Sequence, residues 1–322
     1  MSQLTFFDDD NQWPVPPTLQ NSVFIGTLPK PIWTETKAKL IAGYLKLFLF
    51  ITKHGTYIDG FAGPQDSNNL DSWAAKLVLE MEPKWFRDLY LCELNRNSFR
   101  QLDEMVTSQP PVKGRTVESH LGDFNQWVHE ILATPAVTDS KATFALLDQR
   151  SCECHWSTVE ALANHKKSGR KVELFYFFPT GWVHRTISGF RDKAPLTMWW
   201  GDESWVSIPQ MTQDAAAQLM TTRIRDLGYR DVKAWPIFEN ENGGGRTMYH
   251  MIHATDHDEA PRLMYRAYTK LVGSGPQPEQ YDLVSQLERE QLEAFGEAQD
   301  ASETSECHRP FRAASISRHR RF

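Results

Sequence analysis

Four acidic residues stand where apolar stretches of the chain end, and they are the side chains best placed to build a ligand site. Asp59, Glu93 and Asp148 each close such a stretch, and Asp123 follows another directly after Gly122. In open α/β sheets, nucleotide-like ligands bind in the crevice beyond the carboxyl ends of the strands. The four acids therefore predict one ligand site, if their strands belong to a single parallel sheet.

The first of these strand ends runs into a turn that contains glycine. Gly60 and Gly63 can adopt a positive φ or let a ligand approach the backbone closely. Asp59, just before them, is placed to meet a cation or a pair of hydrogen-bond donors. A plain strand-to-turn junction would contain the same residues, so the segment does not identify a site by itself.

The other three acids have chemical roles and structural alternatives. The two oxygens of Glu93 can accept both hydroxyls of a ribose. Asp123 can meet an adenine amino group or cap the helix that begins at Phe124, and the two roles are compatible. Asp148 faces the place where a substrate would meet a cofactor; its alternatives are an ion pair with Arg150 or a turn cap.

The elements that must position these acids follow from the hydrophobic pattern. Apolar residues at helical spacing follow residue 34 and predict a first helix that ends at Gly55. Strands and helices then alternate, and nearly all-apolar strands of this kind indicate a parallel sheet covered on both faces. The expected strands are 56–60, 88–93, 115–121, 142–148 and 172–178, and the expected helices are near 71–82, 95–107, 123–133 and 156–168.

The remainder departs from this alternation. An aromatic-rich insertion is expected at 180–207, followed by a helix at 209–227. Strands 230–239 and 247–255 flank an asparagine- and glycine-rich loop, which predicts a hairpin and therefore an antiparallel strand in the sheet. A helix at 258–272 closes the main domain, 33–272. We expect an extended lead-in at 1–32 and a tail at 273–322, with a polar helix near 279–298 and a basic end.

The composition limits the setting of the protein. The 322 residues, 40% hydrophobic and 12% aromatic, can build a substantial core. A formal charge of −6 gives no global attraction to nucleic acid or to an anionic membrane, so such binding would need a local patch. Four cysteines form no disulfide framework, which predicts a reducing, cytoplasmic setting. We expect no signal peptide, and the most apolar run, 45–51, is too short to span a membrane.

Over residues 30–270 or so, the chain resembles the three-Cys-motif partner protein family, TcmP. That family in turn resembles class I S-adenosyl-L-methionine (SAM)-dependent methyltransferases, with a Rossmann-like, seven-stranded, mostly parallel sheet that ends in an antiparallel hairpin. The segments that carry the resemblance are Trp33-Thr34-Glu35-Thr36-Lys37, Tyr57-Ile58-Asp59-Gly60-Phe61-Ala62-Gly63-Pro64, Cys92-Glu93-Leu94-Asn95, Gly122-Asp123-Phe124-Asn125, Phe144-Ala145-Leu146-Leu147-Asp148 and Phe178-Pro179-Thr180-Gly181-Trp182.

The resemblance implies a SAM site and a partner. The turn after the first strand would cradle the methionine end of SAM, Glu93 would take the ribose and Asp123 the adenine. Asp148 would orient or deprotonate the methyl acceptor. The family name implies a radical-SAM-like three-Cys-motif protein as partner, in a nucleic-acid or phage-related setting. The implied cofactor residues are Asp59, Gly60, Phe61, Gly63, Glu93 and Asp123.

The leading hypothesis is a SAM-dependent methyltransferase that acts on nucleic acid or a nucleic-acid-associated substrate. Family members usually have proline after the acid of the fourth strand, whereas this chain has Gln149-Arg150. That pair cannot form the rigid Asn/Asp-Pro-Pro-aromatic loop that holds a base nitrogen, so methylation of base nitrogens is not supported. The alternative is an inactive SAM-binding partner protein. A nicotinamide-dependent oxidoreductase is a third, weaker interpretation, because only two glycines stand where three are expected.

Three further groups each have two interpretations. Cys152-Glu153-Cys154-His155 lacks a second cysteine pair for zinc, so we expect no metal; a reactive thiol or a plain loop is left, and the plain loop is favoured. Three tryptophans of the insertion either form a lid that stacks on a base or fill the seam against the core, which is favoured. The arginines at 309–321 either contact phosphates or stay solvated. The tryptophans are Trp199, Trp200 and Trp205.

Overall fold

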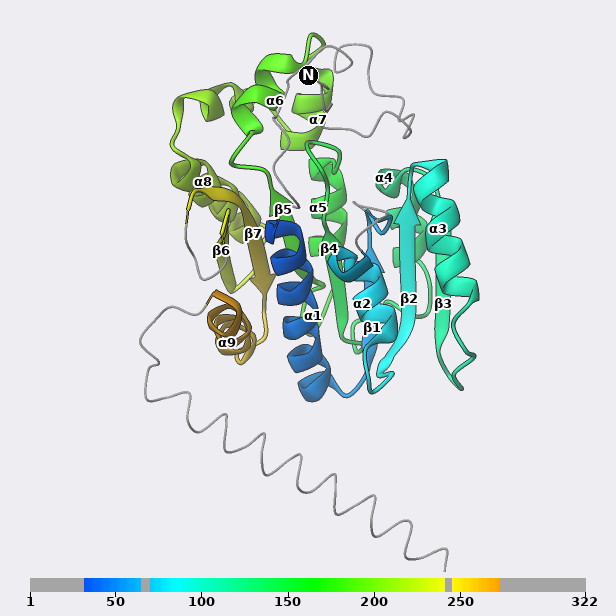
Figure 1. Cartoon of the computed structure of the whole chain (residues 1–322). Coiled ribbons are helices and arrows are strands. Elements are labelled where there is room, and N and C mark those ends of the chain that lie inside the picture. Colours follow the sequence, from blue (N-terminus) through cyan, green and yellow to red (C-terminus); the bar gives the residue numbers. More distant parts are fainter. Residues whose placement is uncertain (1–31, 65–69, 241–244, 273–322) are drawn as a thin grey trace, which may run out of the picture. The chain divides into compact units, whose positions relative to one another are not determined.

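A seven-stranded sheet forms the centre of the structure. The computed structural model describes residues 32–64, 70–240 and 245–272. The strand order is β3-β2-β1-β4-β5-β7-β6 (Figure 1). The predicted lead-in, apart from Ile32, and the predicted tail lie outside the described residues. The strands are β1 (Gly55–Asp59), β2 (Phe86–Glu93), β3 (Thr116–Leu121), β4 (Thr143–Leu147), β5 (Glu173–Phe178), β6 (Asp231–Phe238) and β7 (Thr247–Thr255).

The sheet is parallel from β3 to β5 and antiparallel beyond. β1 pairs in parallel with both β2 and β4, and β7 lies antiparallel between β5 and β6. The prediction of a mostly parallel, Rossmann-like sheet with a terminal antiparallel hairpin is therefore confirmed. Because β1 and β4 are neighbours at the centre while the chain builds outward on either side of them, a topological switch point lies between their carboxyl ends.

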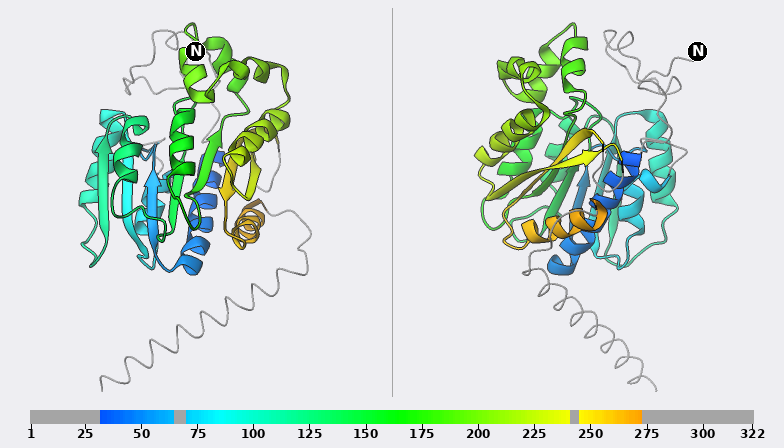
Figure 2. Two further views of the ribbon diagram at one scale, coloured as in Figure 1. Left: turned by 180° about the vertical axis from the view of Figure 1, so that it is seen from behind. Right: turned by 60° about the vertical axis from the view of Figure 1, so that its left-hand side comes forward.

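Helices cover both faces of the sheet. Figure 1 shows α1, α2 and α9 in front of the strands, and the view from behind in Figure 2 shows the opposite face with α4, α5 and α8. Helix α1 also contacts α2 and α9. The helices are α1 (Ile32–Thr52), α2 (Ala74–Glu80), α3 (Arg96–Thr107), α4 (Phe124–Leu132), α5 (Trp156–Asn164), α6 (Val183–Gly189), α7 (Ala194–Trp200), α8 (Gln213–Asp226) and α9 (Ala260–Val272), with 3₁₀ turns η1 (Leu70–Ser72) and η2 (Glu203–Gln210).

Three helices begin at side-chain caps that the sequence carries. Asn95 accepts hydrogen bonds from the backbone N–H groups of Asn97 and Ser98 at the start of α3. Asp123 caps α4 in the same manner, and Thr212 caps α8. Each cap satisfies an N–H group that the first turn of a helix leaves unpaired, which typically stabilises the protein by about 1 kcal/mol.

The insertion predicted at 180–207 is largely helical. It contains α6, α7 and most of η2, and its apolar side chains join the core formed by α4, α5 and α8. Elsewhere the predicted boundaries shift by a few residues. The predicted helix at 71–82 is two short pieces, η1 and α2, and α5 ends at Asn164 instead of 168. No helix among the described residues is long and apolar enough to cross a membrane.

Candidate functional site

The four predicted acids lie at one edge of the sheet. Asp59 ends β1 opposite Leu91 of β2 and Leu146 of β4, and Glu93 ends β2. Asp123 and Asp148 follow the ends of β3 and β4. Backbone hydrogen bonds continue beyond the strands: the N–H of Gly60 donates to the Leu146 carbonyl and that of Ala62 to the Cys92 carbonyl. The sheet thus fixes the turn after β1 between its two neighbours, at the switch point.

Asp59 is almost completely buried, with two hydrogen-bond donors and two acidic neighbours. Its Oδ1 accepts from the backbone N–H of Phe61 at 3.1 Å, and its Oδ2 accepts from the Tyr57 hydroxyl at 2.9 Å. Burial, and after it the charges of Asp148 and Glu93, raise the pKa of Asp59 from 3.8 to about 7, although both hydrogen bonds work in the opposite direction. Close to neutral pH this carboxyl is therefore partly protonated.

Glu93 holds together the ends of β1 and β2. Its Oε2 accepts from the Gly63 N–H at 2.9 Å, and its Oε1 accepts from the Asn95 N–H at 2.7 Å. Burial raises the pKa of Glu93, against the lowering effect of these bonds and of the Arg150 charge. Each carboxylate oxygen has about two lone-pair sites. Even with a further backbone hydrogen bond from Leu94, the carboxylate can therefore still accept a hydrogen bond from a ligand hydroxyl.

Gly60 and Gly63 allow close approaches, and the approaching groups belong to the chain itself. Neither glycine has a positive φ. A Cβ on Gly60 would stand 2.5 Å from the Phe124 ring, and one on Gly63 would stand 2.0 Å from Oε2 of Glu93. Phe61 packs at the rim of the core, 6.2 Å from the Phe124 ring centroid. The fold thus requires glycine at both positions, whether or not a ligand also approaches there.

Asp123 has the capping role that was one of its two predicted functions. Its Oδ1 accepts from the backbone N–H of Asn125 at 2.9 Å and from the Asn125 side-chain amide at 2.8 Å. The same amide group reaches the loop before α5, where it donates to the Glu153 carbonyl. A contact of Asp123 with adenine stays a prediction.

Asp148 forms a buried ion pair with Lys37. Lys37 of α1 places its Nζ 2.8 Å from Oδ1 of Asp148, and the two side chains are only 5% and 8% exposed. Arg150, the ion-pair partner in the alternative interpretation, donates from Nη2 to the Pro64 carbonyl at 3.3 Å. The intervening Gln149 is fully buried and is held between the Phe177 carbonyl and the Cys154 N–H. The Gln149 amide therefore orders the loop after β4.

Two large apolar side chains are exposed beside this edge. Leu94, next to Glu93, is 42% exposed, and Leu121, at the end of β3, is 39% exposed. The Gly122 N–H donates to the Glu93 carbonyl, so the two chain segments are adjacent. An apolar surface of this kind next to a buried carboxylate is typical of ligand pockets, in which apolar walls surround a few polar groups.

The cysteine loop contains no reactive thiol. Cys152 and Cys154 are buried, and burial raises the pKa of both thiols well above the ordinary value. Since the thiolate is the nucleophile, these thiols are poor nucleophiles and the interpretation as a plain loop is the better one. Within the described ranges, no group of three or more His, Cys, Asp or Glu side chains is arranged to hold a metal ion.

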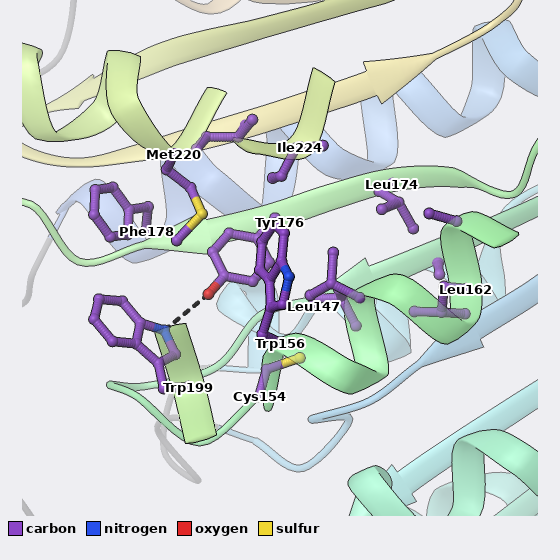
Figure 3. Close-up of a cluster of buried hydrophobic side chains, with 14 of the residues drawn as sticks. Leu147, Cys154, Trp156, Leu162, Leu174, Tyr176, Phe178, Trp199, Met220 and Ile224 are labelled. Carbon is purple, nitrogen blue, oxygen red and sulfur yellow. Dashed lines mark hydrogen bonds between the residues drawn. The ribbon is translucent and has the colours of Figure 1, made fainter. Parts of the chain in front are cut away.

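The tryptophans of the insertion fill the seam against the core, and the lid interpretation is wrong. Trp199 and Trp200 are fully buried, and Trp205 is nearly so. Figure 3 shows Trp199 beside Phe178, with its indole N–H donating to the Tyr176 hydroxyl at 2.8 Å. No face of these rings is available to stack on a base. The predicted basic tail, 309–321, lies outside the described residues.

A pocket of about 290 Å³ lies at the opposite edge of the sheet, by the amino ends of β4 and β5. Glu173 and Thr255 line it together with Lys166. Glu173 is already surrounded by donors, since it accepts from the Tyr44 hydroxyl, from His253 and from Thr255. None of the four predicted acids lines this pocket.

Comparisons with known proteins give structural likenesses only. No family model matches the chain, and no curated protein matches its sequence. A Legionella pneumophila protein of the DUF519 family aligns with a TM-score of 0.41 and 12% identity over 74% of this chain and 90% of its own. Trm1 from Pyrococcus horikoshii, in complex with SAM, has a TM-score of 0.42 and 10% identity over 76% of this chain and 61% of Trm1. The DszA carbon methyltransferase has a TM-score of 0.41 and 13% identity over 68% of this chain and 54% of DszA. The order of the strands, with β7 antiparallel between β5 and β6, is that of a Rossmann-like sheet with a terminal antiparallel hairpin.

Proposed function

We propose that this chain binds SAM at the carboxyl edge of β1, β2 and β4 and is a SAM-dependent methyltransferase. The observation that carries the proposal is the junction of the three strand ends. Glu93 of β2 accepts from Gly63 of the turn after β1, and Arg150 after β4 donates to Pro64 of the same turn. The junction lies at the topological switch point, where open α/β sheets bind nucleotide-like ligands.

The charges at this edge suit a cationic ligand. Asp59, Glu93 and Asp148 are buried acids. Lys37 forms an ion pair with Asp148, and the charge of Arg150 acts on Glu93. In the described part of the chain no lysine or arginine pairs with Asp59, whose pKa is raised by burial and by the other two carboxylates. SAM carries a sulfonium and an ammonium group, so its positive charge would offset this excess.

The remaining groups suit an adenosine. The free lone-pair sites of Glu93 would accept the ribose hydroxyls, and Asp123 would accept the adenine amino group. The exposed side chains of Leu94 and Leu121 would cover the faces of the purine. SAM would supply an activated methyl group, so the protein has only to align the acceptor with it.

For the acceptor we propose nucleic acid or a nucleic-acid-associated substrate. This rests on the resemblance to TcmP and on the basic end of the chain, 309–321. The alternative is an inactive SAM-binding partner of a three-Cys-motif protein. It is favoured by one observation: Gln149, where the family usually has proline, uses its amide to order the loop and offers nothing to an acceptor.

Calorimetry of the full chain with SAM tests the cofactor site. Glu93→Ala should weaken SAM binding more than tenfold, because a hydrogen bond to a charged group contributes about 1.5–3 kcal/mol. The variant also loses the bonds to Gly63 and Asn95, so its unfolding must be measured as well. The matched control is Glu104→Ala, which removes an exposed acid of α3 and should leave SAM binding unchanged.

A second variant separates binding from folding. Leu94→Asp changes a side chain that is already 42% exposed, so unfolding should be unaffected. If the purine lies against Leu94, the new charge should weaken SAM binding at least as much as Glu93→Ala. Unchanged affinity in both variants, or no binding of SAM to the wild type, would refute the proposed site. SAM binding without methyl transfer to RNA, DNA or protein would favour the inactive partner.

A further inference from the structure

Lys37 brings a buried positive charge to the candidate site from outside the sheet. It lies in the second turn of α1, whose first turns are at the edge of the sheet where the strands end (Figure 1). Its ammonium is 2.8 Å from Oδ1 of Asp148, and the side chains are 5% and 8% exposed. Burying two charges is unfavourable unless each compensates the other, so neither residue can be removed alone without consequence.

Two aromatic rings also lie near the ammonium. Its Nζ lies 5.2 Å from the ring centroid of Phe177 in β5 and 5.8 Å from that of Tyr249 in β7. The two rings are in contact, with centroids 4.7 Å apart. The distances from Nζ to the two rings are both within the range of cation–π attraction. Lys37 is thus held by groups from three strands, and its charge and position are both defined.

The pair limits what Asp148 can do. Loss of either charge would leave the other one buried without its counter-charge, which is unfavourable. A carboxylate has about four lone-pair sites, so the pair with Lys37 is compatible with a hydrogen bond from an acceptor to Asp148. The pair also makes this end of the site unfavourable for an acceptor that is itself a cation.

We propose that Lys37 is a positioning residue of the candidate site: it holds the Asp148 side chain in place, so that Asp148 orients an acceptor that arrives without a positive charge. This rests on the proposed function. In the proposed methyl transfer, a lone pair of the acceptor forms the new bond to the methyl carbon. The sulfur of SAM keeps the electrons of the bond that breaks. The displaced acceptor proton passes to water, so Asp148 need not accept it.

The test uses full-length protein and four variants. Lys37→Met removes the charge at similar size, Asp148→Asn removes the opposite charge, and Lys37→Met/Asp148→Asn leaves a neutral pair. The control is Lys39→Met, an exposed lysine of α1 that pairs with Glu35. The measurements are SAM affinity by calorimetry, unfolding free energy in urea, and transfer of labelled methyl from SAM to total RNA, sheared duplex DNA and a protein extract.

Lys37→Met should bind SAM as the wild type does but transfer methyl about 100-fold more slowly, because the acceptor is misaligned. It should be less stable than the wild type, since the buried Asp148 loses its counter-charge. Lys37→Met/Asp148→Asn should regain wild-type stability, yet stay slow in transfer. Lys39→Met should match the wild type throughout.

Several outcomes would overturn the inference. Wild-type transfer rates in either Lys37→Met or Lys37→Met/Asp148→Asn would reduce the pair to a structural ion pair. Methyl label on lysine amines of the protein pool would contradict the expectation that the acceptor carries no positive charge. A wild type that binds SAM but labels none of the three pools would contradict the role of the pair in orienting an acceptor. Failure of the wild type to bind SAM would instead remove the proposed function, and the calorimetry distinguishes that result from the others.

Discussion

Asp59→Asn is the substitution with the clearest expected effect, because it removes a buried acid while keeping its shape. The asparagine Oδ1 can still accept from the Phe61 N–H, and its amide can donate to the Tyr57 hydroxyl, so the two native hydrogen-bond positions remain filled. What disappears is the titration of a carboxyl that is 1% exposed and flanked by the charges of Asp148 and Glu93.

The magnitude follows from the pKa of Asp59 in the two states. In the folded chain it is about 7, and in the unfolded chain it is close to the ordinary 3.8. A raised carboxyl pKa contributes stability that is fully present below the unfolded value and is lost as pH rises through the folded value. Between pH 6 and 8.5 the unfolded carboxyl is already ionised, so the wild type should lose about 1.4 kcal/mol that Asp59→Asn does not lose.

The assay is urea unfolding of the full chain at closely spaced pH values between 6 and 8.5, without SAM. The difference between the wild type and Asp59→Asn isolates this one group, because all other titrating groups are common to both proteins. Asp226→Asn, at an exposed position of α8, should follow the wild-type curve. Parallel curves for the wild type and Asp59→Asn would refute the reasoning, since they would mean that Asp59 does not titrate in this range.

Four further substitutions test the packing and one buried acid. Gly63→Ala should destabilise the protein by about 1.5–3 kcal/mol, because the new Cβ would collide with the Glu93 carboxylate that accepts from the Gly63 N–H. Gly43→Ala, with nothing within 4 Å of the new Cβ, should stabilise it by about 0.5–1 kcal/mol. Urea unfolding would contradict this reasoning if both substitutions changed the free energy of unfolding in the same direction. Trp199→Phe removes the indole N–H that donates to Tyr176 and should cost about 1–3 kcal/mol in thermal unfolding; an unchanged midpoint would rule that out. Burial alone would raise the pKa of Glu173, but its hydrogen-bond donors outweigh burial and lower the pKa. The contribution of Glu173 to stability should therefore disappear as pH falls below 4.5, and Glu173→Gln should make acid unfolding less steep. An identical acid transition in the variant would show that the donors do not favour the ionised form.

The sheet could be predicted because its signals are local. Each central strand is a short apolar run with helical periodicity on either side, and a parallel sheet buried on both faces needs no more than that. The antiparallel pairing of β7 with β6 also follows from a short asparagine- and glycine-rich loop. The element boundaries were less exact where no cap or breaker fixes them, as at the end of α5.

The ion pair of Lys37 could not be predicted, because nothing local indicates it. Its two members are 111 residues apart. The sequence suggested Arg150 as an alternative partner because it is only two residues from Asp148, whereas the packing of α1 against the sheet places Lys37 there. The tryptophans of the insertion illustrate the same limit, since a buried aromatic and a stacking aromatic are identical in sequence.

The four acids are equivalent in the sequence, and the structure makes them unequal. Asp123 caps α4, Glu93 accepts from two backbone N–H groups, and Asp148 has the Lys37 ammonium, so the fold alone accounts for each of the three. Asp59 has two donors, but in the described part of the chain no lysine or arginine pairs with it, and its neighbours are acids. A buried acid that the fold leaves uncompensated lowers stability, and such perturbed groups are common at functional sites. Asp59 is therefore the residue that argues most directly for a positively charged ligand at this edge.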